Sequence, residues 1–89
     1  MGRSHQARPE RLAEKLRDIR TKLGLSQPQM YERLKDVETP LYVGYIGSFE
    51  TGEKVPSLQM VLKYARLAGI AMELIVDDDL ELPEKLLRV

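Results

Sequence analysis

Residues 20–27, Arg20-Thr21-Lys22-Leu23-Gly24-Leu25-Ser26-Gln27, contain signals that end one helix and begin another. Glycine readily adopts the left-handed conformation that follows many helices, so Gly24 predicts a helix end. The Ser26 hydroxyl can cap a following helix, and Pro28 suits its first turn because the missing N–H is not needed there. The stretch therefore predicts two helices joined by a short connection.

The chain before this junction predicts the first helix. From Pro9 onward, apolar residues recur at spacings of four, three and four, which places them on one helical face: Leu12, Leu16, Ile19 and Leu23. Residues 1–8 lack this pattern and are interpreted as a flexible arm. Its Arg3 and Arg8 resemble arms that enter a DNA minor groove, although a disordered tail is the simpler explanation.

The chain after the junction predicts a second helix over residues 27–35. Thr39-Pro40 is an N-cap and first-turn pair, so we expect the third helix to begin there and to end before Gly52. The interval between Leu34 and Ile46 is long for two adjacent helices. We expect it to divide between a longer connection and an extra helical turn.

The last third of the chain predicts a fourth helix that opens at Pro56-Ser57 and ends at Gly69. Residues 70–76 fit a short helix or a strand, and a helix is favoured. Residues 77–89 are interpreted as an acidic C-terminal tail that either docks as one more turn or stays mobile.

Composition limits the class of protein. The 89 residues are 43 % hydrophobic, enough for one compact domain, placed at residues 9–76, and they include no cysteine for a disulfide, a zinc site or a nucleophile. No apolar run approaches the roughly 18 residues that span a membrane, and the first residues lack a signal-peptide pattern. We expect a cytoplasmic protein without a membrane anchor.

The charges are balanced in number but unevenly distributed. Fourteen Lys and Arg match fourteen Asp and Glu. Residues 1–35 hold nine basic and four acidic residues, whereas residues 36–89 hold five and ten. This asymmetry is consistent with a basic half that faces DNA, and also with ordinary solvated helix faces.

Three motifs in the same order carry a resemblance to a known family. The patterns R-x-x-x-G-L-S-Q at 20–27, I-x-x-F-E-x-G at 46–52 and P-S-L at 56–58 resemble those of Cro/CI-type helix-turn-helix proteins, also called the XRE family. The resemblance covers about residues 10–76. It implies an all-α, compact four-to-five-helix domain of the phage-repressor type that binds double-stranded DNA without a cofactor.

The resemblance also implies roles for two charged residues. Arg20 and Glu50 lie beside core positions of the first and third helices, and the family pattern implies that they form a bidentate ion pair. Such a pair would tie the first helix to the helix that reads DNA. The alternative is two unrelated surface charges.

Candidate DNA contacts lie around the second and third helices. Gln27 and Gln29, in the first turn of the second helix, are candidates for phosphate contact together with free backbone N–H groups. Lys54, after the third helix, occupies a position where the family commonly presents a cation. The outward face of the third helix offers further contact residues: Val43, Gly44, Tyr45, Gly47 and Ser48.

That outward face lacks the side chains that read bases with paired hydrogen bonds, namely Arg, Lys, Asn and Gln. Tyr45 is placed to touch a thymine methyl group or a phosphate, or else it packs inward. Gly44 and Gly47 weaken the helix while allowing close approach of another backbone.

No arrangement for catalysis or metal binding is found. His5 has no partner at catalytic or metal-ligand spacing, and Asp77-Asp78-Asp79 lacks the remaining features of a calcium loop, so it is interpreted as a solvated acidic end. We therefore expect neither an enzyme nor a metalloprotein.

The sequence leaves two functional hypotheses. The first is a transcriptional regulator, such as a repressor, that binds operator DNA as a homodimer. The dimer contact would use a second apolar stripe that is equally compatible with core packing: Met60, Tyr64, Leu67, Met72 and Leu74. The alternative is an antitoxin-like or adaptor module that binds a protein partner through the outer face of the third helix.

Overall fold

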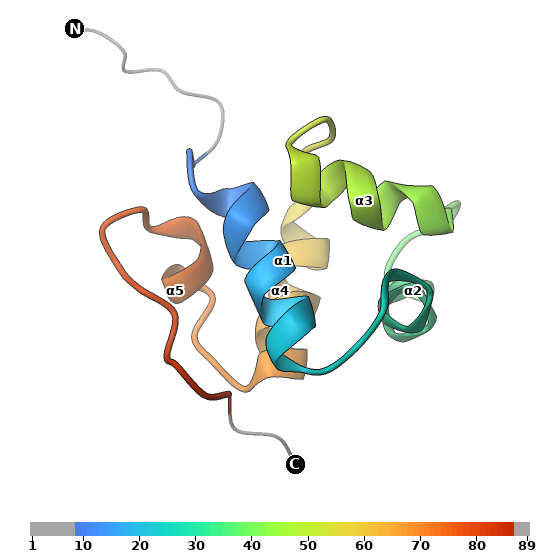
Figure 1. The fold of residues 1–89 in the computed structure, drawn as a ribbon. Coiled ribbons are helices and arrows are strands. Elements are labelled where there is room, and N and C mark those ends of the chain that lie inside the picture. The colour runs from blue at the N-terminus through green and yellow to red at the C-terminus, as the bar shows by residue number, and fades with distance from the viewer. Residues whose placement is uncertain (1–8, 87–89) are drawn as a thin grey trace, which may run out of the picture.

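The computed structural model describes residues 9–86, which form five helices and, within that range, no strand (Figure 1). The expected all-α fold is confirmed, and the ambiguous fifth segment ends in a helix. None of the helices in this range has the length and apolar character that crossing a bilayer requires. The helices are α1 (Leu12–Lys22), α2 (Gln27–Leu34), α3 (Val43–Thr51), α4 (Leu58–Ala68) and α5 (Glu73–Val76).

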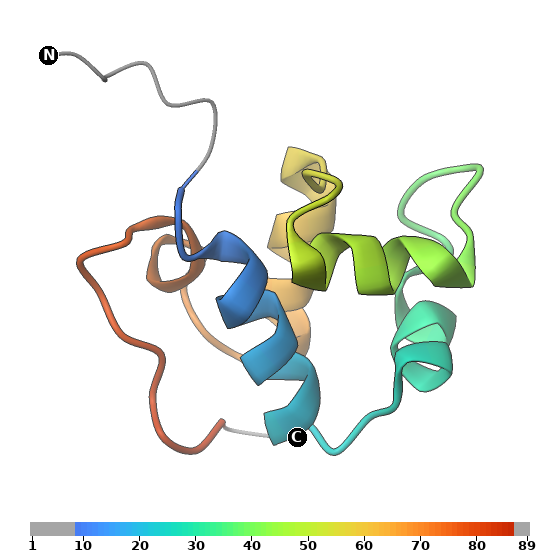
Figure 2. The ribbon, with the colours of Figure 1, turned by 45° about the horizontal axis from the view of Figure 1, so that its top comes forward.

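Helix α1 lies at the centre of the molecule. Figures 1 and 2 show α2 and α3 on one side of it, and α5 with the chain that follows on the other. α1 contacts α3, α4 and α5, whereas α2 contacts α3. Because helices of this length are marginal alone, burial of their apolar faces holds them in place. Side chains without exposed surface come from several helices and include Leu16, Ile19, Met30, Ile46 and Met60.

The helix ends coincide with the expected capping residues. Ser26 Oγ accepts a hydrogen bond from the Gln29 N–H at 3.2 Å, and the Gln29 side-chain oxygen accepts one from the Ser26 N–H at 2.8 Å. Ser57 Oγ likewise accepts from the first turn of α4 at 3.1 Å. Gly24 and Gly69 have φ angles of 75° and 71° just after α1 and α4, where other residues would be strained.

The expected start of the third helix at Thr39-Pro40 is wrong. α3 begins at Val43, and Tyr42 precedes it in an extended conformation with φ −113° and ψ 150°. The physical reason is the burial of Leu41, which is only 6 % exposed and belongs to the core. An extended chain at residues 41 and 42 reaches that position, so the additional residues form a longer connection and no extra turn.

The apolar residues of α4 divide differently from the expected pattern. Met60 and Tyr64 have no exposed surface and form part of the core, so the prediction that they contribute to a dimer contact is wrong. Leu58 and Leu62 are instead 71 % and 36 % exposed. Leu67 is partly buried against the same core.

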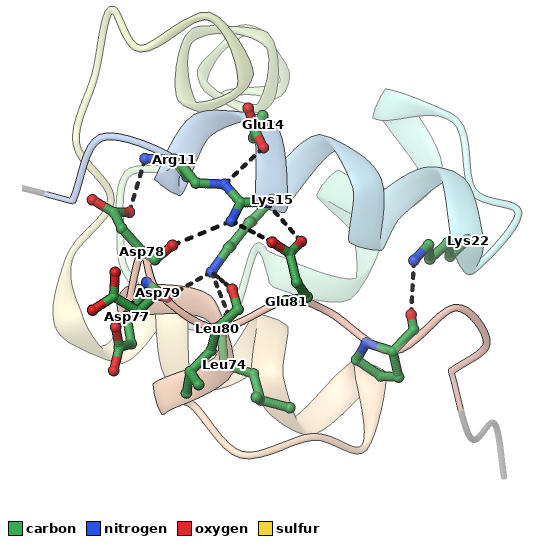
Figure 3. A network of polar contacts seen from close by, with 11 residues as sticks. Arg11, Glu14, Lys15, Lys22, Leu74, Asp77, Asp78, Asp79, Leu80 and Glu81 are labelled. Atoms are coloured by element: carbon green, nitrogen blue, oxygen red, sulfur yellow. Dashed lines mark hydrogen bonds and ion pairs between the residues drawn. The ribbon is translucent and has the colours of Figure 1, made fainter.

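The acidic C-terminal segment packs along α1 without forming a further helical turn; of its three aspartates, Asp77 and Asp79 are exposed as expected, and Asp78 bonds to α1 (Figure 3). The two Asp78 carboxylate oxygens accept hydrogen bonds from the Glu10 N–H at 2.8 Å and the Arg11 N–H at 3.0 Å. The Arg11 guanidinium forms two hydrogen bonds, each 3.0 Å, with the Glu81 carboxylate. Residues 77–86 are called the C-terminal strap below.

Lys15, on α1, holds the strap by donating hydrogen bonds to its backbone. Its side chain is almost fully buried, and Nζ donates hydrogen bonds of 2.8 Å to the backbone oxygens of Leu74, Asp77 and Leu80 (Figure 3). An ammonium group has three donors, so these carbonyls satisfy it completely. At the other end of α1, Lys22 Nζ donates to the Pro83 oxygen at 2.7 Å.

Candidate nucleic-acid interface

A bidentate ion pair fixes α3 against α1. Arg20 Nε lies 2.6 Å from Glu50 Oε2, and Arg20 Nη2 lies 3.0 Å from Glu50 Oε1. The two side chains are only 13 % and 4 % exposed. Arg20 Nη1 also donates to the Leu25 oxygen at 2.9 Å, which connects the pair to the start of α2. The pair that the family resemblance implies is therefore present, and the alternative of two unrelated surface charges is wrong.

Gln27 joins this network. Its Nε2 donates to Glu50 Oε1 at 3.3 Å, and a Cβ added at Gly47 would lie 3.5 Å from the Gln27 side-chain oxygen. The Gln27 amide thus covers Gly47 and connects α2 to α3. In this arrangement the side chain holds α3 in place, whereas the sequence analysis assigned it to a phosphate.

The first turn of α2 has fewer free donors than expected. The Gln29 N–H bonds to Ser26, Pro28 has no N–H, and the Gln29 side chain is engaged in the same cap. The Gln27 N–H remains as a backbone donor of that turn. The cap uses the backbone N–H and the side-chain oxygen of Gln29, so the side-chain N–H₂ group is the donor left for the predicted phosphate contact, and Gln29 is exposed.

The beginning of α3 is the most open part of the predicted face. Tyr42 is 58 % exposed and Val43 is 45 % exposed. Gly44 is exposed too, and a Cβ added there would meet nothing within 4 Å. Ser48 is half-buried and donates from Oγ to Glu53 at 3.4 Å.

Tyr45 packs against neighbouring aromatic side chains, which supports the alternative that it points inward. Its ring meets Tyr42 edge-on with centroids 5.4 Å apart and lies 6.4 Å from the Phe49 ring. Lys54 Nζ lies 4.3 Å from the Tyr45 ring centroid, within the range of a cation–π contact. Lys54 is exposed, so its charge remains open to solvent beside α3.

Arg17 is a candidate that the sequence analysis missed. It is exposed on α1 and lines a hollow of about 390 Å³ together with Gln27, Gly44, Gly47 and Ser48. Its position three residues before Arg20 places it one helical turn from the ion pair. The spacing of Arg17 and Arg20 in the sequence was the feature that could have identified Arg17 as a site residue. The hollow is also lined by Glu53, so its charge is mixed.

Several basic residues of the first half of the sequence bond to other parts of the chain. Arg11, Lys15 and Lys22 bond to the C-terminal strap, and Arg20 is held by Glu50. Four of the seven basic residues at positions 9–35 are therefore engaged by other parts of the chain. Arg3, Arg8 and His5, for which an arm was expected, lie outside the described residues.

Tyr64 lies in the core below this site. Burial raises the pKa of its hydroxyl, and the negative charge of Glu50 adds to the increase. The hydroxyl oxygen has no hydrogen-bond partner within residues 9–86. Tyr64 is therefore a neutral packing residue and does not supply a proton-transfer group.

Comparison with protein-family models, with curated proteins and with solved structures found no match. Within the described range, no group of three His, Asp or Glu side chains comes together in a way that would hold a metal ion.

Proposed function

We propose that this protein is a DNA-binding transcriptional regulator of the Cro/CI helix-turn-helix type, and that α3 enters the major groove of double-stranded DNA. The observation that carries the proposal is the fixed position of α3. Glu50 is held by Arg20 from α1 and by Gln27 from α2, while the first turn of α3 remains uncovered. A helix presented in this way by a rigid body has the form that major-groove reading requires.

Two exposed cations supply the phosphate contacts in this proposal. Arg17 lines the hollow beside Gly44 and Gly47, and Lys54 lies over the Tyr45 ring. Together with the Gln27 N–H they would position α3 in the groove, because phosphate contacts set orientation. With so few free cations, non-specific affinity should be modest at physiological salt.

The test is binding to a fluorescent random-sequence duplex as a function of salt concentration. Each lost phosphate contact lowers the slope of log affinity against log salt by about 0.9. Lys54→Ala and Arg17→Ala should each produce that reduction. Lys85→Ala is the matched control, since Lys85 is an exposed cation on the C-terminal strap, and it should leave the slope unchanged. Absence of binding at low salt would overturn the proposal.

We further propose that the protein binds DNA as a homodimer, with half-sites about 34 Å apart. Leu58 and Leu62 are exposed apolar side chains one helical turn apart on α4, and we assign the contact to them. Sedimentation equilibrium should show a dimer that Leu58→Lys dissociates. A monomer at all concentrations would contradict this part of the proposal.

The competing function is a protein-interaction module of the antitoxin or adaptor kind. It is favoured by the internal use of basic residues and by exposed apolar side chains outside α3, such as Val55 and Leu58. The salt titration separates the two functions, because a protein-binding module needs no affinity for a duplex.

A further inference from the structure

The beginning of α3 presents apolar side chains where a DNA reader usually presents polar ones. Tyr42 and Val43 are the exposed side chains there, and Gly44 has none. Nowhere in α3 is there an Arg, Lys, Asn or Gln, the residues that form paired hydrogen bonds with bases. The Ser48 hydroxyl is bonded to Glu53, which leaves the exposed hydroxyl of Tyr42 as the polar group beside Val43.

The major groove offers one apolar feature that such a surface can read. The 5-methyl group of thymine projects into the groove, and 5-methylcytosine carries the same group at the same position. We propose that α3 reads the 5-methyl groups of pyrimidines through Val43, with the Tyr42 ring beside it, and that base hydrogen bonds contribute little to its specificity. The inference rests on the proposed function, since it requires α3 to enter the groove.

The geometry around Val43 fits this role. It is the first residue of α3, and it is 45 % exposed. The adjacent Gly44 has open space where a Cβ would be, so the helix can approach the base edges closely. Tyr42 is held edge-on against Tyr45, which fixes the direction of its ring.

The flanking charges favour a duplex over a second apolar surface as the occupant. Arg17 lines the hollow beside Gly44 and Gly47, and Lys54 lies over the Tyr45 ring; both are exposed, as contacts with phosphates would require. A protein partner would need no such pair of cations.

The experiment starts from the tightest-binding duplex that selection from a random pool yields. Each thymine position is remade with thymine, uracil, 5-methylcytosine or cytosine, the partner base being changed to match. Reading of the methyl group predicts that thymine and 5-methylcytosine bind equally, each about fourfold tighter than uracil or cytosine at the contacted position. If the protein reads hydrogen bonds instead, duplexes with uracil and with thymine should bind equally tightly, because the two bases have the same hydrogen-bonding groups.

The protein variants locate the effect. Val43→Thr keeps the shape but replaces a methyl group with a hydroxyl group, and should reduce the preference for methylated bases to less than twofold. Val55→Thr makes the same change at another exposed valine, in the loop before α4, and should retain the fourfold preference. Circular dichroism would verify that both variants are folded.

The possible failures are distinguishable. Three results would overturn methyl reading while leaving DNA binding intact. The protein could bind DNA in a salt-dependent way without enriching any sequence, or its affinity could follow the hydrogen-bonding pattern of the bases. The third is a methyl preference that Val43→Thr does not change. No binding to any duplex at low salt would overturn both.

Discussion

Glu50 is the residue at which three helices are joined. Its carboxylate, on α3, accepts hydrogen bonds from Arg20 on α1 and Gln27 on α2, and the side chain is only 4 % exposed. Without it, the Arg20 guanidinium would keep only its bond to the Leu25 oxygen. An unpaired buried charge is unfavourable because water no longer solvates it.

We therefore expect Glu50→Ala to lower the free energy of unfolding by roughly 3–5 kcal/mol, measured by urea denaturation. Glu32→Ala is the control, because it removes the exposed i,i+3 pair with Lys35, whose atoms lie 2.7 Å apart. Exposed pairs contribute less than about 1 kcal/mol. Equal effects of the two substitutions would show that the Arg20–Glu50 pair does not fix α3.

At the scale of the element, α3 combines weak intrinsic stability with an open surface. Glycine within a helix costs about 0.5–1 kcal/mol relative to alanine, and Gly44 has space for the additional methyl group. Gly44→Ala should therefore raise the free energy of unfolding by about that amount. If α3 enters a groove, the same methyl group should weaken duplex binding, which anisotropy titration would measure. If Gly44→Ala is more stable than the wild type and binds the duplex equally tightly, then the DNA does not approach Gly44 closely.

α1 receives its N-terminal cap from Asp78, far along the chain. Hydrogen bonds from the N–H groups of Arg11 and Glu10 hold the pKa of Asp78 below its ordinary value of 3.8. A lowered pKa means that the charged carboxylate stabilises the fold above pH 3.8, and that this stabilisation is lost as the pH falls through the lower folded value.

Asp78→Asn should therefore reduce the stability at neutral pH and flatten the loss of stability below pH 3.8. Urea midpoints measured across that range give the comparison. Glu81, whose pKa is lowered by its hydrogen bonds with Arg11, leaves some acid dependence in the variant. An acid dependence as steep as that of the wild type would mean that Asp78 does not cap α1.

The elements that were predictable from sequence are those with local signals. Ser26, Gly24 and Ser57 mark helix ends because capping involves residues within one turn, and the apolar spacing of α1 identified its buried face. The start of α3 was not predictable from Thr39-Pro40, since the burial of Leu41 depends on distant parts of the chain.

The remaining site features depend on contacts that leave no sequence pattern. Lys15 bonds to backbone carbonyls of residues 59 to 65 positions away, and every residue has a carbonyl. The hydrogen bonds of Lys15 and Lys22 to carbonyls of the C-terminal strap were hidden for the same reason. Of the site, the Arg20–Glu50 pair was predictable through the family resemblance, whereas Arg17 and Tyr42 emerged as site residues only once α1 and α3 were placed.

At the scale of the whole molecule, the C-terminal strap and the α3 face lie on opposite sides of α1 (Figure 1). The strap accepts hydrogen bonds from the Lys15 ammonium group and from the N–H groups at the start of α1. Candidate DNA contacts lie instead on α3 and the loop after it. Stability and binding should therefore be separable by a change confined to the strap.

Ending the chain after Val76 tests that separation. The truncation removes Asp78, Glu81 and two of the three carbonyls that bond to the Lys15 ammonium. Because a hydrogen bond to a charged group contributes about 1.5–3 kcal/mol, the free energy of unfolding should fall by at least about 2 kcal/mol. Duplex affinity, measured at a temperature where the shortened chain is still folded, should remain within twofold of the full chain. A chain ended after Leu86 is the control and should match the full chain in both measurements. Loss of affinity in a folded chain ending at Val76 would show that the strap, and not α1 with α2 alone, positions α3.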